Sequence, residues 1–133
     1  MSLDGNRIAS SMNDISFPMP TTDILLAYYS ALITTIGTKV RMFDYNETVE
    51  IVFQGTDVFS GAQNHPMHLH GHSFYVVGSG VGNFDNETDP KSYNLIDPPK
   101  LNTIRVPKKG WVTVRFIANN RGMFLIWNVA FIF

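Results

Sequence analysis

Cysteine is absent from all 133 residues of the chain. Without a thiol the chain holds no disulfide, iron–sulfur cluster, thiolate metal site or cysteine nucleophile. Charged residues are also few, at 16%, and the formal net charge is only −1 with a pI near 6.4. This charge balance argues against nucleic acid and against an anionic membrane surface as partners.

Long apolar runs are missing as well, since a bilayer span takes about 20 consecutive apolar residues and no stretch reaches that length. The start of the chain, MSLDGNRIASSMNDISF, lacks the apolar core of a secretory leader, so we expect no signal peptide there. The hydrophobic content of 44% and the aromatic content of 13% are high enough for a packed core. We therefore expect residues 1–133 to form a single domain with no membrane span.

Short β-like runs separated by turn residues dominate the sequence. Apolar and polar side chains alternate in ETVEIVFQG (47–55) and in GWVTVRFIANN (110–120). Two more strands are predicted in SFYVVGSG (73–80) and NTIRVPKKG (102–110), with a bend at 108–110. One short helix is predicted near residues 22–32, capped by Thr22 or Asp23. The pattern predicts an all-β sandwich or barrel.

Two further local patterns have a structural and a functional interpretation. We interpret Gly78, Gly80 and Gly82 as loop glycines, because no P-loop Lys-Ser/Thr follows them. Asn46 and Asn86 each begin an Asn-Glu-Thr tripeptide, the acceptor pattern for N-glycosylation on surface loops of secreted proteins. Such tripeptides also arise by chance, and the sequence favours neither interpretation.

All four histidines of the chain lie in NHPMHLHGHSF, which begins at Asn64. In an extended strand His68 and His70 project to the same face about 6–7 Å apart, where they can chelate one metal ion or serve two neighbouring ions. His65 has the opposite parity and precedes Pro66, which favours extended backbone, so it faces a different site. Neutral imidazole is the commonest protein ligand of copper and zinc, and the pattern therefore predicts metal binding. We interpret His72 as a non-ligand.

A family resemblance is carried by NHPMHLHGHSFYVVGSGVGNFD and by NLIDPPKLNTIRVPKKGWVTVRFIANNRG, and extends upstream through GTKVRMFDYNETVEIVFQ, DILLAYY and NDISFPMP. These segments resemble the third, C-terminal cupredoxin domain of plant laccases, which are multicopper oxidases. The resemblance implies a cupredoxin-like Greek-key β-sandwich and a copper cofactor. It also implies one-electron oxidation of phenols, including lignin precursors, with reduction of dioxygen to water, in a secreted protein of the apoplast.

Residue by residue, the resemblance implies three copper ligands. His65 matches a ligand of the type 1 copper, which takes electrons from the phenol. His68 matches a ligand of the type 2 copper and His70 a ligand of a type 3 copper, both in the trinuclear cluster that reduces dioxygen. The strand parity agrees with this division between two sites.

The resemblance breaks after FIANNRG, where the family continues into a His-Cys-His segment and this chain reads MFLIWNVAFIF. Its WNVAFIF resembles the family's closing strand, so we expect that the ligand segment has been excised and that the domain is incomplete at its C-terminal edge. A type 1 copper needs a thiolate beside two imidazoles. The trinuclear cluster also takes ligands from the family's first domain, which these residues do not include. We therefore expect a truncated domain that alone does not catalyse laccase oxidation.

Three alternatives stay open at the level of sequence. In the first, the chain is a non-catalytic copper- or zinc-binding β module that uses His68 and His70, with or without His72. In the second, the chain is a cupin, a class that also carries His-x-His but takes a glutamate near the positions where this chain has Phe74 and Tyr75. In the third, the chain is the product of a gene model or splice event, for which a missing leader and an internal excision are both typical.

Overall fold

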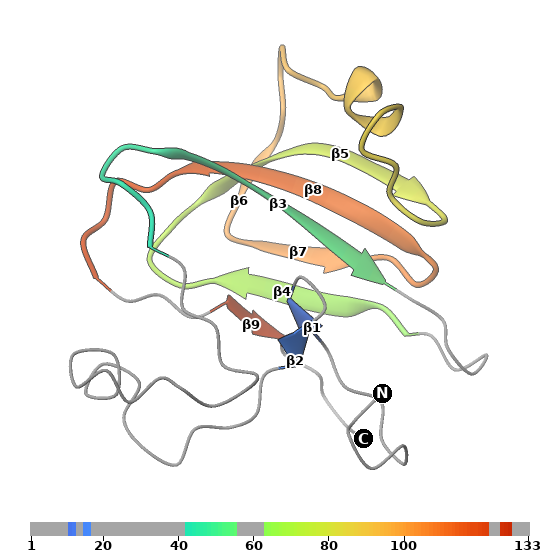
Figure 1. The fold of residues 1–133 in the computed structure, drawn as a ribbon, viewed down its shortest axis with the longest axis horizontal. Coiled ribbons are helices and arrows are strands. Elements are labelled where there is room, and N and C mark those ends of the chain that lie inside the picture. The colour runs from blue at the N-terminus through green and yellow to red at the C-terminus, as the bar shows by residue number, and fades with distance from the viewer. Residues whose placement is uncertain (1–10, 13–14, 17–41, 56–62, 123–125, 129–133) are drawn as a thin grey trace. The chain divides into compact units, whose positions relative to one another are not determined.

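The structure, a computed structural model, describes residues 11–12, 15–16, 42–55, 63–122 and 126–128. The chain divides into two compact units, Met1–Met42 and Phe43–Phe133. In the first unit, β1 (Ser11–Met12) and β2 (Ile15–Ser16) form a two-stranded antiparallel sheet (Figure 1). The helix predicted near residues 22–32 lies outside the described residues, and the single domain over residues 1–133 stays a prediction.

The described residues of the second unit form two antiparallel sheets (Figure 1). The larger has the strand order β3-β8-β5-β6, formed by β3 (Thr48–Gly55), β8 (Gly110–Ile117), β5 (Phe74–Val81) and β6 (Lys100–Leu101). The smaller has the order β7-β4-β9, formed by β7 (Thr103–Val106), β4 (His65–Leu69) and β9 (Ile126–Asn128). In the part of the chain that the structure describes, neither sheet closes into a barrel.

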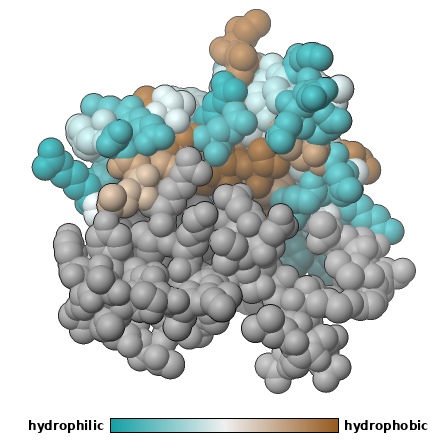
Figure 2. Space-filling model, viewed as in Figure 1, coloured by the Kyte–Doolittle hydropathy of each residue, from teal (hydrophilic) through white to brown (hydrophobic). Residues whose placement is uncertain are grey.

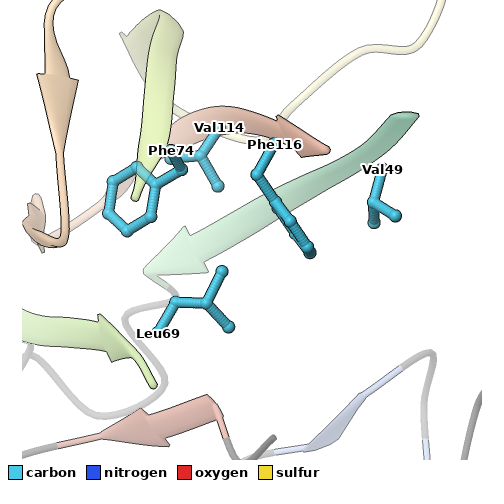
Figure 3. Packing of buried hydrophobic residues seen from close by; sticks show 5 residues of the cluster. All are labelled: Val49, Leu69, Phe74, Val114 and Phe116. Atoms are coloured by element: carbon cyan, nitrogen blue, oxygen red, sulfur yellow. The ribbon is translucent and has the colours of Figure 1, made fainter. Parts of the chain in front are cut away.

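Alternating apolar side chains place the core between the two sheets. The antiparallel pair β3–β8 sets Val49 opposite Phe116, whose side chains share one face because strand side chains alternate with a period of two. Leu69 reaches the same core from β4, in the smaller sheet. The buried cluster drawn in Figure 3 consists of Val49, Leu69, Phe74, Val114 and Phe116. The strands predicted at residues 47–55 and 110–120 are confirmed as β3 and β8, but β8 is buried on both faces, because Trp111 and Thr113 are buried as well as Val112 and Val114.

The strands predicted in residues 102–110 and 110–120 are also present, but they belong to different sheets. β7 pairs with β4, whereas β8 pairs with β3 and β5. The chain passes between the sheets through residues 107–109, where Lys109 adopts a φ of 56°, the left-handed region used in turns. This crossing brings β7 beside the histidine-bearing strand.

The interpretation of Gly78 and Gly80 as loop glycines was wrong, because both lie in β5. The register between β5 and β8 shifts between Val76 and Gly78, which is a β-bulge that changes the face of the following residues. A Cβ atom on Gly78 would lie 2.6 Å from the Tyr93 ring, and one on Gly80 would lie 2.7 Å from the Trp111 indole. The glycines therefore make room for aromatic rings that cover the outer face of the sheet.

The all-β prediction is confirmed, since the helical structure among the described residues is one 3-10 turn, η1 (Asp89–Ser92). No helix in those ranges combines the length and the apolar character that a membrane span requires. Figure 2 shows hydrophilic side chains mixed with a few apolar ones on the described part of one face. Among the large apolar side chains that the structure describes, Ile96 is the most exposed, with 98% of its surface accessible, and it lies in the loop after η1.

Candidate metal centre

The histidine cluster is built on β4, the central strand of the smaller sheet. Both edges of β4 are paired, and His68 lies opposite Thr103 of β7 and opposite Trp127 of β9. Leu69, the last residue of the strand, is only 5% exposed and anchors it in the core. Because successive side chains alternate, the pleat that directs Leu69 into the core directs His68 to the opposite face.

The ring of His68 is held by two groups, one on the neighbouring strand β7 and one on the residue just before it. Its Nδ1 lies 2.8 Å from the carbonyl oxygen of Asn102 and 2.9 Å from Oγ1 of Thr103. The Thr103 hydroxyl also donates to Oδ1 of Asn102 at 3.2 Å. These contacts fix the orientation of a half-buried imidazole at the centre of the sheet.

His70 follows β4 directly, at the start of a turn in which Gly71 takes a positive φ of 77°. The side chain of Asn120 donates to the Gly71 carbonyl oxygen at 3.1 Å, which ties this turn to the segment after β8. The ring centroids of His68 and His70 are 4.8 Å apart, with an interplanar angle of 77°. The structure thus brings together the two histidines that the strand parity predicted to share a face.

The other two histidines lie apart from this pair. His65 is the first residue of β4, opposite Val106, and the strand pleat gives it the parity of Leu69 rather than of His68. The His72 ring packs against Phe116 of the core at a centroid distance of 5.0 Å, and both of its ring nitrogens are buried. The interpretation of His72 as a non-ligand stays a prediction.

The donor set of the site is therefore a pair of imidazoles. Across residues 42–55 and 63–122, no group of three or more His, Cys, Asp or Glu side chains is placed to hold a metal ion. Two imidazoles fit copper or zinc, with the remaining coordination positions left to water or to another protein group. A type 1 copper does not fit this chain, because no cysteine exists to supply its thiolate.

The two glycosylation candidates lie outside the histidine cluster, and both are exposed. Asn46 lies in the turn before β3 with a φ of 67°, and its N–H donates to the Ala118 carbonyl. Asn86 lies in the loop before η1, beside Asp85. The backbone N–H groups of Glu87 and Thr88 donate to Oδ1 of Asp85, and these bonds lower the pKa of that carboxyl below its ordinary value.

Sequence reasoning missed Asn102 and Thr103, the two residues that hold His68. Asn102 directly precedes β7 and Thr103 is its first residue, so two polar residues at the start of the strand are the signal that the sequence offers. Nothing local in the sequence indicates that β7 pairs with the histidine strand, because the pairing joins residues more than 30 positions apart. The contact depends on the tertiary register His68–Thr103.

The described residues form an all-β, cupredoxin-like domain that presents two adjacent imidazoles, and comparison with known proteins gives its family. Residues 8–128 match the model of the multicopper oxidase family. The chain is 46% identical to Laccase-14 of Arabidopsis thaliana over 147 residues, covering 92% of this chain and 26% of that protein. It is 42% identical to Putative laccase-1 of Oryza sativa subsp. japonica, covering 92% of this chain and 26% of that protein.

The chain belongs to the multicopper oxidase family, as a laccase-type domain. Membership of this family implies copper as the cofactor. The chain spans about a quarter of the length of the curated relatives it matches, as the 26% coverage of Laccase-14 shows. The resemblance found in the sequence is therefore confirmed at the level of the family.

Proposed function

We propose that this chain is a partial C-terminal laccase domain that binds copper through its His-x-His pair and that alone does not oxidise phenols. The observation that carries the proposal is the 4.8 Å separation of the His68 and His70 rings in a chain without cysteine. The imidazole pair supports metal binding, whereas the missing thiolate argues against the electron-accepting type 1 site.

The ligand assignment follows the family pattern. In an intact laccase, His68 would bind the type 2 copper and His70 a type 3 copper, and the closeness of their rings supports a shared cluster. In this chain by itself, the two rings would hold one copper(II) ion between them. In an intact laccase, His65 would be a type 1 ligand, and its opposite strand parity supports its separation from the pair. Without a thiolate beside it, His65 would hold no copper in this chain. In an intact laccase, the bound copper would supply one-electron transfer from phenols and the reduction of dioxygen. The chain's own residues hold and orient the imidazoles.

An internal loss of sequence is supported by the alignments. The match to Laccase-14 extends over 147 positions although it covers 92% of this 133-residue chain. The match to Laccase-13 of Arabidopsis thaliana, at 39% identity, extends over 168 positions and covers 98% of the chain. Within the aligned region these relatives therefore carry residues without a counterpart here. We attribute part of that difference to a His-Cys-His segment missing after residue 122.

The activity test compares the purified chain, loaded with copper(II), with intact Laccase-14. We expect the chain to leave a phenolic dye unoxidised and to lack the intense blue absorption of a thiolate–copper bond, both of which the intact laccase should show. Dye oxidation by the chain together with a blue band would contradict the proposal.

The remaining family properties belong to the same proposal. The whole oxidase would act on phenolic molecules and dioxygen with the cupredoxin domains that accompany this one in laccases, and it would be secreted to the apoplast.

Exposed Asn46 and Asn86 would then carry glycans. Expression in plant cells behind a secretory leader should give an electrophoretic shift that a glycosidase reverses and that the pair Asn46→Gln and Asn86→Gln abolishes. A chain with no shift would overturn glycosylation.

A second candidate function is a non-catalytic copper or zinc module. It is favoured by the same imidazole pair, because two histidines with open positions suit either ion. Calorimetric titration with copper(II) and with zinc(II) separates the two candidates. Nitrogen ligands generally bind copper(II) more tightly than zinc(II). A zinc affinity that is higher relative to the copper affinity than this general preference allows would favour the non-catalytic module over the partial laccase domain.

A further inference from the structure

The hydrogen bonds of His68 identify which ring nitrogen carries its proton. A carbonyl oxygen has no proton to donate and can only accept. The 2.8 Å contact between the Asn102 carbonyl and Nδ1 of His68 therefore requires a proton on Nδ1. In a neutral imidazole only one nitrogen is protonated, so the lone pair available to a metal lies on Nε2.

Thr103 contributes to the same arrangement through the direction of its hydroxyl proton. The hydroxyl donates to Oδ1 of Asn102 at 3.2 Å, which leaves its oxygen free to accept from His68 Nδ1 at 2.9 Å. The single Nδ1 proton is then shared between the Asn102 carbonyl and the Thr103 oxygen. The Asn102 carbonyl can only accept and so favours this tautomer outright, whereas the Thr103 hydroxyl favours it because its own proton is donated to Asn102.

The fold places these two residues where they can act on His68. Thr103 lies directly opposite His68 in the β4–β7 ladder, so their side chains share one face at close range. Asn102 lies between β6 and β7, where the chain passes from the larger sheet to the smaller one. Its carbonyl also accepts from the N–H of Leu69 at 3.3 Å, which keeps it beside β4.

We propose that Thr103 and the Asn102 carbonyl form a clamp that fixes His68 in the Nδ1-protonated tautomer before any metal arrives, so that Nε2 is its copper-binding nitrogen. The inference rests on the proposed function for the identity of the metal, but the tautomer itself is a property of the metal-free chain. Thr103 is a positioning residue that acts through His68. Loss of such an outer contact typically weakens metal affinity by about 10- to 100-fold.

The first test measures the tautomer without metal. In a chain labelled with ¹⁵N at histidine, two-bond ¹H–¹⁵N correlation spectra at about pH 8, where imidazole is neutral, distinguish protonated from unprotonated ring nitrogens. We expect His68 to show a protonated Nδ1 and an unprotonated Nε2. A His68 ring protonated mainly on Nε2 would overturn the clamp.

The second test changes the hydroxyl. Thr103→Val keeps the shape and strand propensity of the side chain but removes the acceptor, and Thr103→Ser restores it. We expect Thr103→Val to lower the Nδ1-protonated fraction of His68 and to weaken copper(II) binding by about 10-fold, with recovery in Thr103→Ser. Thr48→Val, on an exposed threonine of β3, is the matched control and should change neither quantity.

The outcomes separate this inference from the proposed function. Unchanged tautomer and affinity in Thr103→Val would remove Thr103 from the clamp. Copper binding that persists after His68→Ala would contradict the proposed function, while the spectra of the metal-free chain would still report the tautomer.

Discussion

Two polar clusters lie on the two sheets of this protein, and they use their hydrogen bonds differently. On the larger sheet, Glu50 of β3 and Arg115 of β8 face each other in register and form an ion pair at 2.6 Å. Tyr93 donates to Oγ1 of Thr113 at 3.1 Å, and the Arg115 guanidinium lies 5.4 Å from the Tyr93 ring centroid. Each member of this cluster has a partner within it.

On the smaller sheet, the hydrogen bonds that hold the His68 ring all reach one of its two nitrogens. His68 uses Nδ1 for Asn102 and Thr103, and its neighbour His70 is exposed. The comparison teaches that a structural polar cluster stabilises the fold by internal pairing, whereas a ligand site fixes its side chains and leaves their coordinating atoms available. Substitutions in the first cluster should therefore change stability, and those in the second should change metal affinity.

The largest effect is expected from the double substitution His68→Ala and His70→Ala. Loss of a residue that only orients a metal ligand weakens metal affinity by up to about 100-fold. Removing both imidazoles should weaken copper(II) binding by more than that. Isothermal titration calorimetry measures the change, and His65→Ala is the matched control on the same strand, expected to bind like the unmodified chain. Equal loss in His65→Ala would show that the pair is not the site.

The next effect is expected in the other cluster, from Tyr93→Phe. This substitution removes the donor to Thr113, which is fully buried, and should lower the free energy of unfolding by about 1–2 kcal/mol. Urea denaturation measures the loss, and copper affinity should stay unchanged. A variant as stable as the parent chain would show that the hydroxyl of Tyr93 contributes nothing to the fold.

A smaller loss is expected from Glu50→Gln, which breaks the ion pair with Arg115. The two side chains are 36% and 37% exposed, so solvent screens their attraction and the loss should be about 0.5 kcal/mol. Repeating the denaturation in high salt should shrink the difference between parent and variant. A difference that grows with salt would be incompatible with a screened ion pair.

The smallest effect appears only in alkaline solution. Burial raises the pKa of Tyr93 above its ordinary value of 10.0. Because the pKa of Tyr93 is higher in the folded state than in the unfolded state, its contribution to the stability of the fold is complete below the unfolded-state pKa. That contribution is lost as the pH rises through the folded-state pKa. We therefore expect stability to fall above about pH 10, and to fall less steeply in Tyr93→Phe. Identical pH profiles would contradict a role for Tyr93.

Much of the fold follows from local patterns in the sequence. The runs that became β3, β5, β7 and β8 could be predicted because alternation and turn residues are local signals. The assignment of β7 and β8 to different sheets could not, since it depends on contacts across the core. The same limit applies to Gly78 and Gly80, whose place in β5 is explained by the rings of Tyr93 and Trp111.

The candidate site divides in the same way. The shared face of His68 and His70 follows from strand parity, and the structure brings their rings to 4.8 Å. The contacts of His68 with Asn102 and Thr103 need the β4–β7 register, which no local pattern encodes. The terminal run was predicted to form a strand, and Ile126–Asn128 does pair with Met67–Leu69 as β9. Residues 123–125 and 129–133 lie outside the described residues.

Electron paramagnetic resonance of the copper(II)-loaded chain tests the central claim most directly, because nitrogen hyperfine structure counts the imidazoles on the metal. The account predicts two nitrogen ligands, a loss of this structure in the His68→Ala and His70→Ala double variant, and no intense blue thiolate band. A spectrum unchanged in the double variant would contradict the claim that this pair is the copper site.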